Sequence, residues 1–446
     1  MNKILTIAAL ALVLSACSNE DNDIQTPVEQ PAKSEGIPFT ATISIGESAM
    51  TRALTEDATN NQIVPTWATG EKVALIYTVG STPTKTDAEV TKQADGTATI
   101  SATLESGATN GSDVTIIYPS TAADGTTGNV LANLLAAQDG TLATIATNYD
   151  VRKGTGKLSI NDEKATVNNG TAGTTVSLTN QNAIFKFTLS GPTIDASHPL
   201  VIKKGENEVV TTVTPTSSTT SVYVAMPPAA SSTYKFFVKT NNNKYIKSGT
   251  AVITAGKYYQ TTLNMPARYP LALANATKED LGSVIGADGK IYLNMTAATN
   301  ASTTAVAMIA YLGSETGVAG YTHGLALALS DESDKMHWTT ATGASGAAAH
   351  TPAAPTPITS SWMLPSKDQW DKMIDACKNV LGTQNNFKDL RDGFSGISGA
   401  SNLKPWYYWS STEGDSGYAW CYYFVGGYAS NHEKDMFSNV RACLAF

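Results

Sequence analysis

Short runs of alternating apolar and polar residues dominate the chain from about residue 39 to residue 266. The runs are rich in β-branched and aromatic residues, and Gly, Asn, Asp and Pro turns separate them. A period of two predicts β-strands, and the spacing of the runs predicts packed β-sandwiches. Clear examples lie at 73–77, 114–118, 183–189, 222–226 and 234–238. The best helix candidate in this half is 129–138.

Composition limits the class of partner and of fold. Of the 446 residues only 15% are charged, the formal net charge is −8, and no basic cluster occurs. This argues against nucleic acid as a partner. Beyond residue 17 the chain has only Cys377, Cys421 and Cys443, so at most one intramolecular disulfide can form and the fold must rest on its cores.

The first residues resemble a lipoprotein signal. Lys3 precedes an apolar run at 4–14 that is too short to span a bilayer, which predicts a signal peptide at 1–16. Leu14-Ser15-Ala16-Cys17 matches the lipobox of bacterial lipoproteins, which implies lipidation of Cys17 and an outer-membrane anchor; the alternative is a cysteine merely close to a cleavage site. Residues 17–37 are acidic and poor in apolar side chains, which predicts a flexible tether. The acidic residues also resemble a surface-export signal of lipoproteins, and a solvated linker is the alternative.

Five short motifs follow one another in the β-rich half. They are Thr51-Arg52-Ala53, Trp67-Ala68-Thr69-Gly70-Glu71-Lys72-Val73, Ala183-Ile184-Phe185-Lys186-Phe187, Tyr223-Val224-Ala225-Met226-Pro227 and Ala255-Gly256-Lys257-Tyr258-Tyr259. Their order resembles that of fimbrillin-like proteins, the fimbrial subunits of Bacteroides-type bacteria. The resemblance covers about half of the chain, and its one departure is Gly70-Glu71 where Gly-Asp is commoner.

This resemblance implies two transthyretin-like β-sandwiches in tandem, at 38–175 and 176–266. It also implies assembly with other fimbrial subunits by donor-strand insertion, after a trypsin-like protease cuts behind an arginine and an N-terminal strand leaves. Residues 39–45 alternate as a removable strand should, and Arg52 and Ala53 follow as the expected processing site. The alternative is that the strand stays and Arg52 is a surface arginine.

The remaining residues, 267–446, differ from the β-rich half in composition. They hold six of the seven tryptophans and every cysteine after residue 17. The capping box at 366–369 predicts a helix of about fifteen residues that packs on a sheet. Strands are predicted at 407–410, 420–424 and 440–446. The apolar face of the predicted helix carries Trp370, Met373, Ile374, Cys377 and Leu381, with Gly382 as its stop.

Motifs in this half resemble a bacterial branch of the C-type-lectin-like fold, which is similar in outline to sulfatase-modifying-factor domains. The resemblance covers about 180 residues and implies an α+β binding domain at 267–446, which makes the chain mainly β overall. The motifs are Trp362-Met363-Leu364-Pro365-Ser366 with Trp370, Tyr408-Trp409-Ser410-Ser411-Thr412-Glu413 and Val440-Arg441-Ala442-Cys443.

No catalytic or metal-binding constellation supports an enzyme. Cys421 and Cys443 are too far apart for the reactive cysteine pair of sulfatase-modifying enzymes, and the histidines lack the spacing of the iron-dependent relatives. Sugar-binding calcium motifs are missing as well. We therefore expect no catalytic residue, metal or cofactor. The loop carboxylates, which calcium would need as ligands, are expected to be merely solvated; they are Glu413, Asp415, Glu433 and Asp435.

Aromatic residues are the candidates for ligand binding. Tyrosine and tryptophan offer large contact areas at low entropy cost, which suits a sugar or protein ligand. Trp406, Tyr407 and Tyr428 are the candidate residues, while Trp370, Trp409 and Trp420 are expected in the core. The wider set that could form such a platform also includes Tyr418, Tyr422 and Tyr423.

The function expected from these patterns is a fimbrial subunit that adheres to a host or bacterial surface glycan or protein. The alternative is a surface lipoprotein that binds a glycan or peptide and never polymerises. Val440, Ala442, Leu444 and Phe446 alternate toward one face, so the last strand is expected in the domain core. A subunit that accepts a strand but has none to donate is expected to cap the fimbrium tip.

Overall fold

The structure is a computed structural model that is mainly β. It describes residues 36–45, 55–57, 59, 62–64, 67, 70–93, 97–125, 127–170, 173, 175–378, 380–381 and 386–446. The expectations for residues 1–35, including Cys17, and for Arg52, Ala53 and Gly382 lie outside the described residues. Within them, no helix is long and apolar enough to cross a bilayer.

The first β unit is a sheet that closes on itself. Its strands follow the order β10-β1-β6-β5-β4-β7-β9-β12, β11 pairs with β1, and β10 pairs with both β1 and β9. The closure runs through β9, whose first part pairs with β7 and whose second part pairs with β10. A Cβ on Gly156 would lie 2.3 Å from the Val167 side chain, so glycine permits this close approach. The strands are β1 (Ile37–Ser44), β4 (Lys72–Val79), β5 (Thr82–Lys92), β6 (Thr97–Leu104), β7 (Asp113–Tyr118), β9 (Arg152–Asn161), β10 (Lys164–Asn168), β11 (Thr175–Ser177) and β12 (Thr179–Asn180).

Strand β1 covers the run predicted as a strand at 39–45. It pairs with β6 along its whole length, and its other edge pairs with β10 and β11. Phe39, Ala41 and Ile43 are buried in the first core, while the residues between them face outward. The alternation therefore places β1 inside the first unit.

The second β unit is a sandwich of two sheets, β16-β13-β19 and β18-β17-β14-β15-β8. Phe187 and Phe236 meet edge to face in its core, with ring centroids 5.2 Å apart. Its strands are β13 (Ala183–Ser190), β14 (Leu200–Lys204), β15 (Glu208–Val213), β16 (Ser221–Met226), β17 (Ala229–Lys239), β18 (Lys244–Ile253), β19 (Tyr258–Asn264) and, from earlier in the chain, β8 (Ala137–Gln138).

The helix expected at 129–138 is wrong. These residues form turns that lead into β8, and the buried Gln138 side chain bonds the backbone N–H and C=O of Ala225 at 2.9 and 2.8 Å. This pairing with the second unit fixes an extended backbone at Gln138. The helical residues lie just after it, in α1 (Leu142–Thr144) and the π-helical turn η2 (Ile145–Tyr149), and a 3-10 turn η1 (Ser120–Ala122) precedes it.

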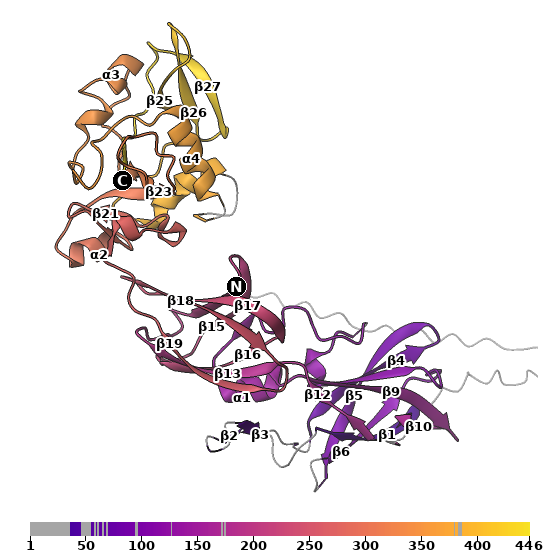
Figure 1. Ribbon diagram of the computed structural model, residues 1–446. Coiled ribbons are helices and arrows are strands. Elements are labelled where there is room, and N and C mark those ends of the chain that lie inside the picture. The colour runs from indigo at the N-terminus through magenta and orange to yellow at the C-terminus, as the bar shows by residue number, and fades with distance from the viewer. Residues whose placement is uncertain are drawn as a thin grey trace, which may run out of the picture.

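The C-terminal unit combines a six-stranded sheet, β20-β22-β21-β23-β24-β28, with a three-stranded sheet, β25-β26-β27. Figure 1 shows it in orange and yellow beyond the second unit. Its strands are β20 (Leu271–Ala272), β21 (Val284–Gly286), β22 (Lys290–Tyr292), β23 (Ala305–Leu312), β24 (Gly324–Ala328), β25 (Tyr407–Glu413), β26 (Tyr418–Tyr423), β27 (Tyr428–Glu433) and β28 (Cys443–Ala445). Its helices are α2 (Met295–Asn300), α3 (Trp338–Thr342), α4 (Lys367–Cys377) and α5 (Asn386–Gly393), with 3-10 turns η4 (Leu273–Asn275), η5 (Lys278–Asp280), η6 (Ala347–Ala349) and η7 (Phe394–Gly396).

The capping box is confirmed, because Ser366 and Gln369 bond each other's backbone N–H at the start of α4. The helix is shorter than expected and ends at Cys377. Trp370 and Trp409 are fully buried as predicted. Trp420 is not, because it points away from the face of β26 that buries Ala419 and Cys421. Its ring is half-buried and lies 5.1 Å from the Lys367 ammonium.

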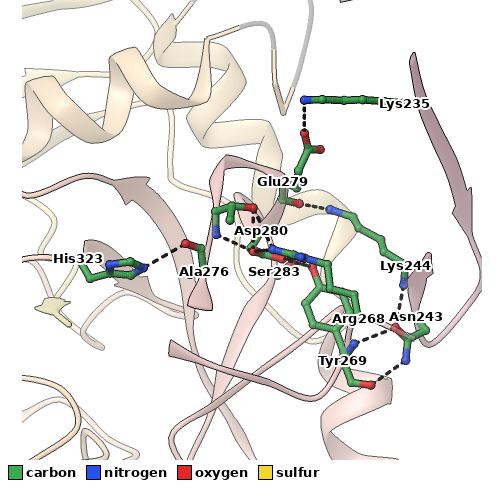
Figure 2. A network of polar contacts seen from close by, with 11 residues as sticks. Lys235, Asn243, Lys244, Arg268, Tyr269, Ala276, Glu279, Asp280, Ser283 and His323 are labelled. Atoms are coloured by element: carbon green, nitrogen blue, oxygen red, sulfur yellow. Dashed lines mark hydrogen bonds and ion pairs between the residues drawn. The ribbon is translucent and has the colours of Figure 1, made fainter. Parts of the chain in front are cut away.

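A polar network joins the second β unit to the C-terminal unit (Figure 2). The fully buried Asp280 carboxylate accepts hydrogen bonds from Arg268 Nε at 2.6 Å, the Tyr269 hydroxyl at 2.8 Å and the Thr277 N–H at 2.8 Å. Burial alone would raise the pKa of Asp280, but these bonds outweigh it and hold the pKa below its usual range. The network therefore holds an ionised carboxylate in the interior.

Two residues at the start of β18 extend this network (Figure 2). The Asn243 amide bonds both the N–H and the C=O of Tyr269, at 2.9 and 2.8 Å. Lys244 donates to the Glu279 backbone carbonyl, and burial lowers the pKa of its ammonium to about 8. The second unit is thus hydrogen-bonded to the chain segment that leads into the C-terminal unit.

We predict that Asp280→Asn weakens this junction by about 3 kcal/mol, because it leaves the Arg268 guanidinium without its buried partner. Chemical denaturation followed by tryptophan fluorescence measures the loss, and faster tryptic cleavage behind Arg268 locates it. Glu206→Gln is the control, because the Glu206 carboxylate is about half exposed, solvent screens its pairs with Lys235 and Lys278, and its loss should cost much less stability than the loss of Asp280. Equal stability of Asp280→Asn and the wild type would contradict the assignment.

Candidate functional site

Three tyrosines line up across the small sheet of the C-terminal unit. Tyr407 of β25 lies opposite Tyr423 of β26, which lies opposite Tyr428 of β27. Residues directly opposite on neighbouring strands project to the same face. The rings of Tyr407 and Tyr423 stack at 4.6 Å, and those of Tyr423 and Tyr428 meet at 5.4 Å. We call these three residues the tyrosine row.

Contacts among its own members fix the tyrosine row. The Tyr407 and Tyr428 hydroxyls are 3.2 Å apart, and this hydrogen bond raises the pKa of Tyr407 to about 12. The turn that joins β26 to β27 contains Gly426, and a Cβ there would lie 2.5 Å from both the Tyr423 and the Tyr428 rings. Glycine therefore lets the rings close over the turn. The row is a preformed surface of rings and hydroxyls.

The exposure of the predicted binding residues differs. Trp406 is 54% exposed and Tyr428 is 46% exposed, whereas Tyr407 is half-buried within the row. Lys335 lies 5.7 Å from the Trp406 ring centroid. Of the three predicted binding residues, Trp406 and Tyr428 are thus exposed, with Tyr407 as a support between strands.

Two other tyrosines of the expected platform lie elsewhere. Tyr422 is fully buried and donates to Asp371 at 2.6 Å, so it belongs to the core. Tyr418 is exposed, but it lies opposite Glu433 and alternates away from the face that carries Tyr423. Sequence reasoning did not single out the position of Tyr423 between Tyr407 and Tyr428. That position depends on the pairing register of three separate strands, which no local pattern in the sequence predicts.

A cavity of about 350 Å³ lies beside the start of α4. None of its lining side chains carries a charge, and Trp362 supplies a largely buried aromatic wall. Gln369 uses its amide within the protein, donating to the Thr316 carbonyl at 2.7 Å and accepting from the Ser366 N–H at 2.8 Å. The cavity can therefore take a small uncharged group. Sequence reasoning singled out residues 362–366 as a motif without expecting a cavity there.

The buried cysteines and His350 have structural surroundings. Cys377, Cys421 and Cys443 are free and buried, and burial raises the pKa of each thiol, which disfavours the reactive thiolate. His350 bonds Glu332 at 2.7 Å, and its ring contacts Trp362.

Of the four carboxylates expected in loops, Glu413 and Glu433 instead end strands β25 and β27. Glu413 pairs with Lys434, and Asp415 accepts from the N–H groups of Gly417 and Tyr418. Among the described residues, no group of three or more His, Cys, Asp or Glu side chains is arranged to hold a metal ion.

Comparison with known proteins gives weak similarities only. No family model and no curated protein matches the sequence. Among solved structures, a fimbrial protein from Bacteroides ovatus is similar at 13% identity over 92% of this chain and 99% of that chain, with a TM-score of 0.26. A putative cell adhesion protein from the same species has 12% identity over 52% of this chain and 95% of its own, with a TM-score of 0.29.

The tip fimbrial protein Mfa3 from Porphyromonas gingivalis, with a C-terminal truncation, has 9% identity over 48% of this chain and 81% of its own, with a TM-score of 0.22. At such low identities and TM-scores, the similarities establish neither a shared fold nor a shared function.

We predict that Tyr407→Ala raises the pKa of His432 toward its ordinary value of about 6.5. The ring centroids are 4.2 Å apart, and burial is what lowers the pKa of His432. Because the unfolded chain takes up this proton more readily, the contribution of His432 to stability falls as pH drops through about 6.5. An NMR titration of the imidazole measures the shift, with Tyr418→Phe as the control. An unchanged pKa in Tyr407→Ala would contradict the geometry of the row.

Proposed function

We propose that the protein is a cell-surface fimbrial subunit whose C-terminal unit is an adhesive head carried at the fimbrium tip. The tyrosine row carries this proposal. Its three rings and their hydroxyls are held in place before any ligand arrives, so little conformational entropy is lost on binding.

The ligand of the head is a host or bacterial surface glycan or protein. Tyr428 and Trp406 present exposed aromatic rings, which stack on sugar rings or fill apolar pockets of a protein, and the tyrosine hydroxyls add hydrogen bonds. Tyr407 positions Tyr428 through their hydroxyl contact. We also propose that residues 267–446 have a C-type-lectin-like fold.

The junction at Asp280 suits an adhesive head. A head that holds a surface transmits force to the shaft through its connection. Here the connection combines a buried ion pair with the two-sided bonding of Tyr269 by Asn243. Such a joint resists rotation better than an exposed linker would.

Assembly with other fimbrial subunits would use the first β unit, whose last strand, β12, ends at Asn180, and a transthyretin-like second unit would follow it. If the chain is cut behind Arg52, β1 can leave. The gap that β1 leaves, between β6 on one side and β10 and β11 on the other, then accepts a donor strand from another subunit. Phe39, Ala41 and Ile43 mark the pockets that the donor would fill.

The position of β28 in the head supports tip placement. It pairs with β24 on one side, Met363 bridges Cys443 on the other, and its residues are fully buried. Residues 443–445 are therefore part of the head and are not free to act as a donor strand, as expected for a subunit that accepts a strand without donating this one. Lipidation at Cys17 with the tether at 17–37 would place the protein on the outer membrane before assembly, and loss of palmitate-analogue labelling in Cys17→Ala tests this.

The alternative is a surface lipoprotein that binds its ligand without polymerising. The observation that favours it is the pairing of β1 on both edges, which makes this strand an integral part of the first unit. Both candidates share the adhesive head and differ only in the fate of β1. Recovery of protein that begins at Ala53 from fimbriae would favour the fimbrial subunit.

We predict that the Trp406→Ala, Tyr428→Ala double variant loses at least about tenfold in binding, because central aromatic anchors dominate interfaces. Arrays of glycans and surface proteins, probed with the full chain, identify the ligand and measure the loss. Tyr418→Ala is the matched control, since it removes an exposed tyrosine from the opposite face of the same sheet. Equal binding by the double variant and the wild type would place the adhesive surface elsewhere.

A further inference from the structure

One carboxylate from the hairpin of β2 (Thr55–Asp57) and β3 (Gln62–Val64) lies on the second β unit. Glu56 accepts from Lys186 Nζ at 2.7 and 2.9 Å, the Tyr223 hydroxyl at 2.5 Å, the Tyr258 hydroxyl at 2.9 Å and Gln260 Nε2 at 3.0 Å. All of these partners lie more than a hundred residues further along the chain. Both carboxylate oxygens are thus bonded by a distant part of the fold.

The four donors form an ordered set on the sheet β16-β13-β19. Lys186 lies opposite Tyr223 on one neighbouring strand and opposite Gln260 on the other. Tyr258 lies opposite Ile184, two residues back along β13, and so projects to the same face. This face is the outer one, because Phe187 projects from the other face into the core. The sheet itself, through its register, assembles the site.

Backbone pairing does not attach the described strands of the hairpin to the second unit. Within the described residues, β2 and β3 pair only with each other, and a two-stranded hairpin alone is marginally stable in water. Its position on the second unit therefore depends on side-chain contacts, and Glu56 supplies five hydrogen bonds.

The chemistry of the site selects a carboxylate. Hydrogen bonds from Lys186, Tyr223 and Tyr258 lower the pKa of Glu56 to about 2, and the bond to Glu56 raises the pKa of Lys186. An amide in the same place would leave the Lys186 ammonium without its counter-charge and would point donors at donors. Charged hydrogen bonds of this kind are stronger than neutral ones.

We infer that the outer face of the sheet β16-β13-β19 is a carboxylate-binding site whose ligand is the β2–β3 hairpin of this chain, held through Glu56. We call this contact the latch, because it holds the β2–β3 hairpin, which follows β1 in the chain, on the second unit. If the chain is cut behind Arg52, a consequence that rests on the proposed function, the new N-terminal segment stays docked while β1 leaves.

Hydrogen exchange tests the latch within the intact chain. Lys186→Gln removes the ammonium and leaves the sequence of 53–64 unchanged, so we expect exchange of the amides at 55–64 to become at least about tenfold faster. Amides of β13 should keep their protection. Lys157→Gln is the control, because it removes a lysine from an exposed ion pair on the first sheet. Unchanged exchange at 55–64 in Lys186→Gln would overturn the latch.

A peptide of residues 53–64 tests the carboxylate site directly. We expect it to bind the full chain carrying Glu56→Gln, whose site lacks its own carboxylate, and to bind the wild type more weakly. The peptide with Gln at position 56 should bind roughly 10- to 100-fold more weakly, and adding Lys186→Gln to the receptor should remove binding.

Equal affinity of the two peptides, or none for either, would overturn the site. Because neither measurement involves adhesion or fimbriae, failure of the proposed function would leave these results unaffected.

Discussion

The buried carboxylate of Asp280 is the contact on which the arrangement of the chain depends. It bonds Arg268, Tyr269 and the Thr277 N–H at the point where the second β unit ends and the C-terminal unit begins. A buried charge without partners is strongly unfavourable, so these groups must keep their positions together. The C-terminal unit is therefore oriented by the same residues that stabilise the junction.

Local sequence patterns predicted those elements whose cause is local. The alternation of apolar and polar residues predicted strand β1, and the capping box predicted that α4 begins after Ser366. Both features depend only on neighbouring residues. Closure of the first sheet through β9 and β10 escaped prediction, since it depends on a close approach at Gly156 to Val167. The wrong helix at 129–138 has the same origin, because a contact between Gln138 and Ala225 decides the backbone there.

The candidate site was predictable only in part. Trp406 and Tyr428 were candidate binding residues from the sequence, and both side chains are exposed, with Tyr428 at the start of β27. The tyrosine row itself required the register of three strands, which no local pattern encodes. The carboxylate site at Lys186 is a similar case, because Glu56 is one acidic residue in a polar segment and its partners lie far along the chain.

The central claim is that the C-terminal unit is an adhesive head at the end of a filament. Electron microscopy of cells that carry the protein, with a gold-labelled antibody against residues 267–446, tests it most directly. A head at the tip predicts gold at the free ends of fimbriae and bare shafts between. Regular labelling along the shaft, or labelling of the cell surface with none on any filament, would contradict the claim.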